Sequence, residues 1–263
     1  MALIKTDIEI EKIRTSSLLV GKTIAEVAKH IRPGVTTAHL DKIADEYIRD
    51  HKAKPAFKGY HGFPSTLCIS VNEVVVHGIP GNRELKEGDL VSIDCGTIID
   101  GYFGDSAFSF GLLPVAVEIE LLMQRTHNSL LKAIKSITPG KRVGDIGFEV
   151  QSYVESFGYS VVRDLVGHGL GTSLHEKPEI PNYGKRGTGA KLEVGMVICI
   201  EPMINLGSRQ VMQEKDGWTI RTLDKKASAH FEHAITIRNY GAEILSSFTD
   251  IEQVSNPDIV IIR

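Results

Sequence analysis

The sequence contains an internal duplication that relates its first half to its second. Apolar residues at helical spacing precede Pro33-Gly34, and a second apolar run at the same spacing follows it. The same order recurs around Pro139-Gly140. Each copy therefore predicts an amphipathic helix, a Pro-Gly break and a second amphipathic helix. The apolar positions are Ile24, Val27, Ile31, Leu40, Ile43 and Tyr47 in the first copy, and Leu130, Ile134, Ile137, Ile146, Val150 and Tyr153 in the second.

A predicted strand follows each helix pair. Leu85 to Asp94 reads LKEGDLVSID, and Leu192 to Glu201 reads LEVGMVICIE. Each is a glycine turn followed by a β-rich strand that ends on a carboxylate. The repeat is too long for a solenoid, and two related α+β halves that pack together fit it better. We expect a single domain over residues 1–263, with halves at about 1–115 and 120–250 and a join near residues 111–126.

Alternation along these strands predicts where their carboxylates point. Asp94 alternates with Ile93 and Cys95, so we expect one apolar face and Asp94 on the opposite face. In the second half Cys199 and Glu201 share a face of an otherwise apolar strand, which we expect to be covered on both sides. A pseudo-two-fold axis between the halves would bring Asp94 and Glu201 together, and this predicts a site between them.

The acidic residues around these strands suggest a metal site. Asp94 and Asp105 flank a predicted hairpin with Asp100-Gly101 at its turn, and a hairpin brings its two ends together. A single aspartate at a strand end is most often a turn or cap residue. Several carboxylates within apolar segments are costly to bury unless they are paired or bind a cation. The candidate ligands are Asp94, Asp105, His168, Glu201 and Glu232.

Charge counting favours two divalent ions. The four carboxylates carry −4 and a ligating histidine is neutral, so two divalent cations balance the cluster. The oxygen-rich set favours Mn, Fe(II), Co or Zn over a metal selected by thiolates. Cys68, Cys95 and Cys199 are not spaced as a zinc site, and their odd number argues against a disulfide framework.

Several strings in the sequence resemble those of type I methionine aminopeptidases: YHGFP, CISVNEVVVHGIP, the hairpin with its two aspartates, GHGLG, IEP and FEH. They occur in the family's order, from the first predicted helix to Ile237. The resemblance implies the α+β pita-bread fold, in which two pseudo-two-fold-related halves form a curved antiparallel sheet covered by helices. It also implies a hydrolase that removes the initiator methionine from nascent polypeptides, with a preference for a small second residue.

The same resemblance implies a role for each candidate ligand. Asp94 would chelate one ion, while His168 and Glu201 bind the other. Asp105 and Glu232 would bridge the two ions. Glu201 also looks best placed to handle the proton of the attacking water. The resemblance leaves the metal open among Co, Mn, Fe(II) and Zn.

The resemblance further implies a set of substrate-binding residues. His77 and His175 resemble the pair that contacts the substrate amide and stabilises the tetrahedral intermediate, although each could instead be a structural loop histidine. Methionine requires a narrow, apolar and polarisable pocket. The expected pocket residues are Phe57, Tyr60, Phe63, Cys68, Leu174 and Trp218, which would otherwise be ordinary core residues.

Composition and charge exclude several other classes of protein. The net charge is −3, and no long run of like charges predicts a nucleic-acid or anionic-membrane surface. No apolar run has the length of a membrane span, and Met1–Lys22 has no uninterrupted apolar segment typical of a signal peptide. We expect a cytoplasmic monomer that acts on nascent peptides. The sequence leaves contact with the ribosome open.

Two alternative functions remain. The first is an X-Pro-specific peptidase of the same fold, but such enzymes generally carry a further N-terminal domain, for which we expect no room here. The second is a non-catalytic binding protein on this scaffold. Such proteins have usually lost metal ligands, whereas all the candidate ligands are present in this chain.

Overall fold

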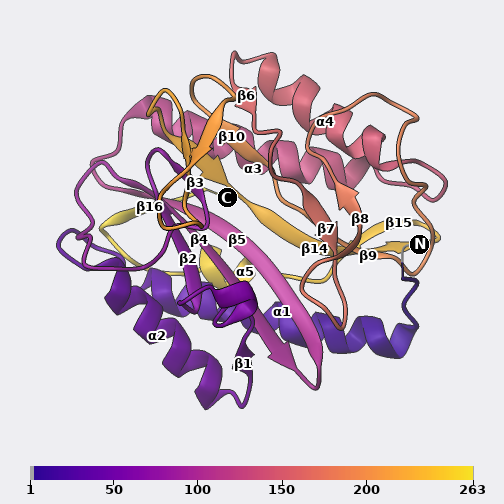
Figure 1. Ribbon diagram of the computed structural model, residues 1–263, viewed down its shortest axis with the longest axis horizontal. Coiled ribbons are helices and arrows are strands. Elements are labelled where there is room, and N and C mark those ends of the chain that lie inside the picture. The colour runs from indigo at the N-terminus through magenta and orange to yellow at the C-terminus, as the bar shows by residue number, and fades with distance from the viewer. Residues whose placement is uncertain (1–2, 263) are drawn as a thin grey trace.

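The computed structural model describes residues 3–262, and its four long helices form two pairs. Figure 1 shows the first pair at the bottom of the view and the second pair at the top, with strands of the large sheet between them. A short helix and a 3₁₀ turn complete the helical elements. The helices are α1 (Asp7–Ala28), α2 (Thr37–Asp50), α3 (Val117–Ser136), α4 (Val143–Glu155) and α5 (Thr249–Glu252), and the 3₁₀ turn is η1 (Tyr60–Gly62).

Both predicted helix–break–helix units are confirmed. Gly34 and Gly140 have φ angles of 83° and 88°, and each lies between the two helices of its pair. A side chain is strained at such angles, so glycine suits both breaks. The first helix begins with a capping box, in which the Thr6 side chain accepts from the Glu9 amide and the Glu9 carboxylate accepts from the Thr6 amide. Among residues 3–262, none of the helices combines the length and the hydropathy that a membrane span requires.

Within the described part of the chain, a ten-stranded antiparallel sheet forms the centre of the molecule, which confirms the predicted α+β class. Its main path runs β1 (Lys54–Pro55), β4 (Leu90–Ile99), β5 (Tyr102–Leu112), β14 (Glu232–Arg238), β9 (Val197–Ile200), β7 (Gly167–Gly169) and β8 (Glu176–Ile180). Three further strands pair with this path: β2 (Leu67–Val71), β15 (Gly241–Ile244) and β16 (Ile259–Ile261).

Two small sheets complete the fold. Each has three strands. One contains β13 (Ser228–His230), β10 (Met203–Asn205) and β6 (Ser160–Val161), and the other contains β11 (Val211–Gln213), β12 (Ile220–Thr222) and β3 (Val74–Val76). The second of these small sheets positions two loops of the cavity described below, because His77 follows β3 and Trp218 precedes β12.

The register of the large sheet places the acidic residues on one face. The β4–β5 hairpin turns at Asp100-Gly101, as predicted, with φ angles of 50° and 79°. Ala107 of β5 pairs with Asp94 on one side and with Glu232 on the other, so these three residues form a row across neighbouring strands. Asp105 lies two residues from Ala107 and therefore points to the same face. The prediction that the first strand ends at Asp94 was wrong, because β4 continues to Ile99 in the hairpin.

The alternation predicted for the two strands is confirmed. Ile93 and Cys95 are buried in the core that also contains the helix pairs, and Asp94 lies on the other face. Strand β9 is covered on both sides, because Ile198 belongs to this core and Cys199 to a second apolar cluster.

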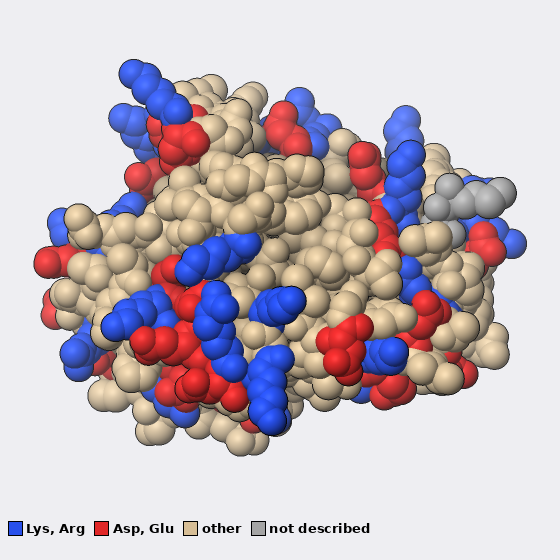
Figure 2. All heavy atoms as spheres, turned by 60° about the horizontal axis from the view of Figure 1, so that its bottom comes forward, with Lys and Arg blue, Asp and Glu red and all other residues tan. Residues whose placement is uncertain are grey.

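The face that carries α1 and α2 mixes charges of both signs. Figure 2 shows Lys and Arg side chains interspersed with Asp and Glu across much of this face. Short-range pairs account for part of the pattern, including Lys29 with Glu26 at 2.7 Å and Arg49 with Asp45 at 2.7 Å. Such a face produces no large field of one sign.

A buried histidine in α3 predicts acid-dependent stability. His127 is only 3% exposed and packs against the rings of Phe108, Phe231 and Phe248. Burial lowers its pKa from 6.5 to about 4. The unfolded chain therefore binds this proton more readily, so stability should fall as the pH drops from 6.5 towards 4, by about 3 kcal/mol in total for this group.

Urea unfolding between pH 4 and pH 7 would test this expectation. The variant His127→Leu removes the titrating ring and should show a shallower loss of stability with falling pH than the parent. Parallel pH profiles for the two proteins would show that His127 contributes nothing to acid sensitivity.

Candidate metal centre

A cavity of about 450 Å³ is lined by every residue predicted to bind metal or substrate. Its wall combines a group of carboxylates and histidines with a group of apolar and aromatic side chains. The expected residues that line it are Phe57, Tyr60, Phe63, Cys68, His77, Asp94, Asp105, His168, Leu174, His175, Glu201, Trp218 and Glu232.

Buried carboxylate oxygens in this cavity lack protein partners. Among the described residues, Asp94 Oδ1, Asp105 Oδ1 and Glu232 Oε1 are buried and accept no hydrogen bond. An unpaired buried carboxylate is costly, and each of these oxygens is a ligand that a hard divalent cation accepts. The donor set therefore fits a metal centre.

The raised pKa values of the carboxyl groups also favour a metal centre. Burial raises the pKa of Asp94 to about 7. Burial also raises the pKa of Asp105 well above its usual value, and the charges of Glu232 and Asp94 add to this effect. For Glu201 and Glu232 the pKa rises well above the usual value, chiefly through burial and then through neighbouring carboxylates. A bound cation would lower these pKa values, because it stabilises the ionised carboxylates.

His168 is prepared to act as a ligand through one ring nitrogen. Its Nδ1 lies 2.9 Å from the carbonyl oxygen of Gly169, which places the proton on Nδ1. Its Nε2 then faces the carboxylates, at 3.5 Å from Glu201 Oε1 and 3.7 Å from Asp105 Oδ2. Burial, followed by the charge of His175, lowers the pKa of His168 to about 3, so the ring is neutral as coordination requires.

Three further residues surround this group and were not predicted as site residues from the sequence. The thiol of Cys199 lies with ligand atoms of Asp105, His168 and Glu232, all within 4.8 Å of one another. Its alternation with Glu201 was a usable signal, because the two share a face of β9. His230 Nε2 lies 3.9 Å from Glu201 Oε2, and the amide of Asn182 donates to the Glu201 carbonyl at 3.0 Å. No spacing in the sequence indicates these last two contacts.

Aromatic rings form the apolar end of the cavity. Trp218 meets Phe63 edge-on, with 5.2 Å between ring centroids. The loop that carries Trp218 is held by Asp216, which accepts from the amides of Trp218 at 2.8 Å and Thr219 at 2.9 Å. Cys68 is buried in the same apolar cluster. The result is a pocket with polarisable sulfur and ring atoms next to the carboxylates.

His175 joins the two ends of the cavity. Its ring stands edge-on to that of His168, with centroids 4.4 Å apart, and its Nδ1 lies 2.9 Å from the hydroxyl of Tyr60. His77 enters from a different loop, and its φ of 57° is unusual for a residue with a side chain. Burial, and then the charge of His175, lowers the pKa of His77 to about 4. Burial also lowers the pKa of His175, so both rings favour the neutral form and can donate a hydrogen bond beside the carboxylates.

Comparisons with known proteins agree with this geometry. The model of metallopeptidase family M24 matches residues 11–239. A methionine aminopeptidase of Clostridium perfringens is 48% identical over 94% of this chain and 99% of its own length. The crystal structure of methionine aminopeptidase from Rickettsia prowazekii is 43% identical and superimposes with a TM-score of 0.93, covering 94% of this chain and 100% of the other.

A more distant structure separates fold from function. Prolidase from Pyrococcus furiosus is similar at a TM-score of 0.77 but is only 22% identical, and this chain covers 66% of it. That likeness shows the fold alone. Together with the Rickettsia structure, it confirms the pita-bread architecture expected from the sequence motifs.

Proposed function

The chain belongs to metallopeptidase family M24, and from its cavity we propose that it is a methionine aminopeptidase that removes the initiator methionine from nascent polypeptides. One observation carries the proposal: buried, partnerless carboxylate oxygens lie in the same cavity as a compact aromatic and thiol-containing pocket. The first group suits a metal-assisted hydrolase and the second suits a methionine side chain.

The proposed centre binds two divalent ions, with Co, Mn, Fe(II) and Zn as candidates. Asp94 would hold one ion, and His168 with Glu201 would hold the other. Asp105 and Glu232 would contribute to both. The positions of Asp94 and Glu232 on opposite sides of Ala107, with Asp105 on the same face, support this division.

The mechanism assigns separate tasks to the side chains around these ions. The bound ions would supply Lewis-acid polarisation of the substrate carbonyl and a water of lowered pKa. Glu201 takes the proton from the attacking water, and its side chain is more exposed to the cavity (12%) than that of Asp105 (5%). His175 donates a hydrogen bond to the developing oxyanion, and His77 contacts the substrate amide.

The first experiment compares short peptides. We expect Met-Ala-Ser and Met-Gly peptides to be cleaved, and Met-Lys, Leu-Ala and X-Pro peptides without methionine to be poor substrates. The pocket walls formed by Trp218 and Phe63 should discriminate against Leu-Ala by about tenfold or more in kcat/KM. Release of the first amino acid, followed by chromatography, measures this preference.

The outcome also separates the alternative functions. Preference for X-Pro over Met-Ala would favour a proline-specific peptidase, whose solved relatives share only the fold with this chain. Absence of all peptidase activity in metal-loaded protein would favour a binding protein on the same scaffold. All the proposed ligands are present, which supports the enzyme.

The remaining parts of the proposal concern the cellular setting. We place the enzyme in the cytoplasm, acting as a monomer on nascent peptides at the ribosome. Residues 1–263 form a single catalytic domain of two related halves, at about 1–115 and 120–250. The repeated helix–break–helix units support this division.

A further inference from the structure

A buried ion pair connects the start of the described chain to the loop of His175. Lys5 Nζ lies 2.5 Å from Glu176 Oε2, and both side chains are only 6% exposed. The backbone of this segment is itself fixed, because the Lys5 amide donates to the Gly195 carbonyl at 2.8 Å and Ile4 forms a β-bridge with Met196. The ammonium group of Lys5 is therefore held at a defined position beside Glu176.

The other oxygen of Glu176 closes the turn that leads to His175. Glu176 Oε1 accepts from the amides of Thr172 at 3.0 Å and Ser173 at 3.3 Å. Gly171 leaves no space between the turn and the ion pair, since a Cβ atom there would lie 2.6 Å from Lys5 Nζ. One carboxylate thus joins the N-terminal segment, through Lys5, to the backbone of this loop.

This loop carries two side chains of the cavity. Leu174 lines the apolar pocket, and His175 reaches the Tyr60 hydroxyl and the ring of His168. Glu176 also lines the cavity, but neither it nor Lys5 belongs to the group formed by Asp105, His168, Cys199 and Glu232. Nothing in the mechanism above uses the pair, although its two charges are costly to bury.

We propose that Lys5 is a positioning residue. Through Glu176 it fixes the position of His175, the proposed donor to the oxyanion. The expected effect on turnover rests on the function proposed above, whereas the expected effect on the loop does not. Without Lys5, Glu176 is a buried and uncompensated charge, and water can then draw it away from the amides of Thr172 and Ser173. The turn would loosen, and His175 would lose its fixed place.

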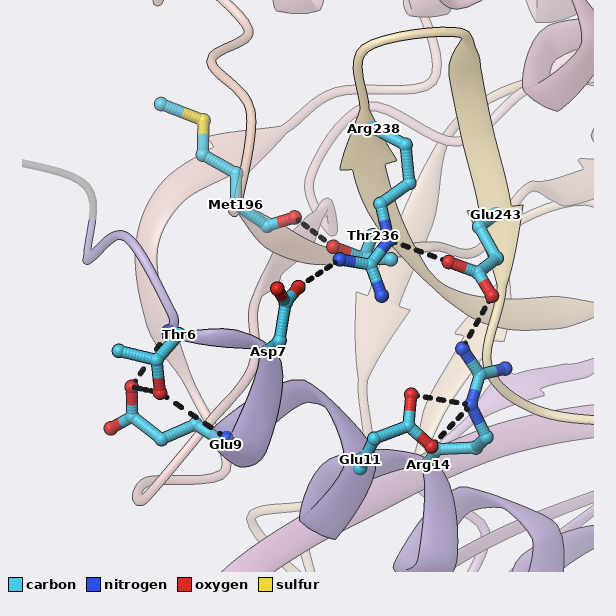
Figure 3. Close-up of polar contacts among 9 residues, drawn as sticks. All are labelled: Thr6, Asp7, Glu9, Glu11, Arg14, Met196, Thr236, Arg238 and Glu243. Carbon is cyan, nitrogen blue, oxygen red and sulfur yellow. Dashed lines mark hydrogen bonds and ion pairs between the residues drawn. The ribbon is translucent and has the colours of Figure 1, made fainter.

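Hydrogen exchange of the loop amides tests the structural part. In Lys5→Met, the segment 171–175 should exchange about tenfold faster or more, whereas Lys5→Arg keeps the charge and should lie closer to the parent. The matched control is Arg238→Met. Arg238 pairs with Asp7 at 2.5 Å and with Glu243 at 2.6 Å, so it fixes the same end of the chain to the sheet (Figure 3), and neither ion-pair partner belongs to the loop. It should leave exchange of 171–175 unchanged.

Kinetics with metal-loaded protein test the catalytic part. Lys5→Met should lower kcat for Met-Ala-Ser by about ten- to a hundredfold, with bound metal unchanged, because small displacements of a catalytic group have effects of this size. Arg238→Met should keep kcat near the parent value. In a His175→Ala background the Lys5→Met loss should shrink to within about twofold, since a residue that acts through His175 has nothing left to position.

Two results would overturn the proposal. One is unchanged exchange of the loop in Lys5→Met. The other is an equal further loss of kcat when Lys5→Met is added to His175→Ala, which would show a general loss of structure. If the parent releases no methionine, the proposed function fails instead, and loop exchange still decides whether Lys5 holds the turn.

Discussion

Exhaustive chelation is expected to abolish peptide hydrolysis and to lower the melting temperature, and a divalent ion should restore both. The reason is the set of buried carboxylate oxygens on Asp94, Asp105 and Glu232 that no protein group satisfies. Binding of ions to the folded state alone adds about 2.7 kcal/mol of stability when the free metal is at a hundred times its dissociation constant. Activity and melting curves of chelated and reloaded protein measure both effects.

The metal-free protein should also show a characteristic dependence on pH. Burial raises the folded-state pKa of Asp94 from 3.8 to about 7. A group of this kind favours the folded state at low pH, and its contribution is lost as the pH rises through about 7. The melting temperature of chelated protein should therefore fall as the pH rises from about 4 to about 7, relative to that of metal-loaded protein. Full turnover without metal, or equal melting temperatures throughout, would contradict a shared metal site.

Local patterns in the sequence were sufficient for much of the fold. Pro33-Gly34 and Pro139-Gly140 interrupt the helical periodicity of the sequence. In the structure both glycines have positive φ angles, as a break between two helices favours. Alternation around Asp94 placed it opposite the helix-facing core, because a pleated strand has only two faces. The candidate metal ligands Asp94, Asp105 and Glu232 came together for the same reason, since neighbouring strands in register align such faces.

Other features depend on contacts that no local pattern records. The end of β4 was misplaced because pairing with β5 extends the strand beyond Asp94. Lys5 and Glu176 are 171 residues apart in the chain, and each alone looks like a surface charge. The contact of Asn182 with the Glu201 carbonyl likewise arises only when two loops pack together. Such tertiary pairs require the folded structure.

Replacement of Glu201 is the substitution for which we expect the largest loss of activity. Glu201 directly follows β9, where its side chain faces His168 at 3.5 Å and remains partly open to the cavity. Glu201→Gln preserves the size of the side chain but removes the negative charge that takes up a proton. Turnover should fall on the order of 10²- to 10⁴-fold, the range typical of a general acid–base group, with an added loss where metal binding weakens.

Metal analysis separates the two contributions. The comparison variant is His175→Ala, which should retain both ions and a near-normal melting temperature while losing about 2.7–4 kcal/mol of transition-state stabilisation as a lost oxyanion donor. His168→Ala removes a ligand and should lower metal content together with activity. If Glu201→Gln keeps its ions but loses turnover, the carboxylate acts on the proton. A residue that served only as a metal ligand would instead lose metal and activity together, as expected for His168→Ala. Activity within a few-fold of the parent would assign Glu201 a purely structural role.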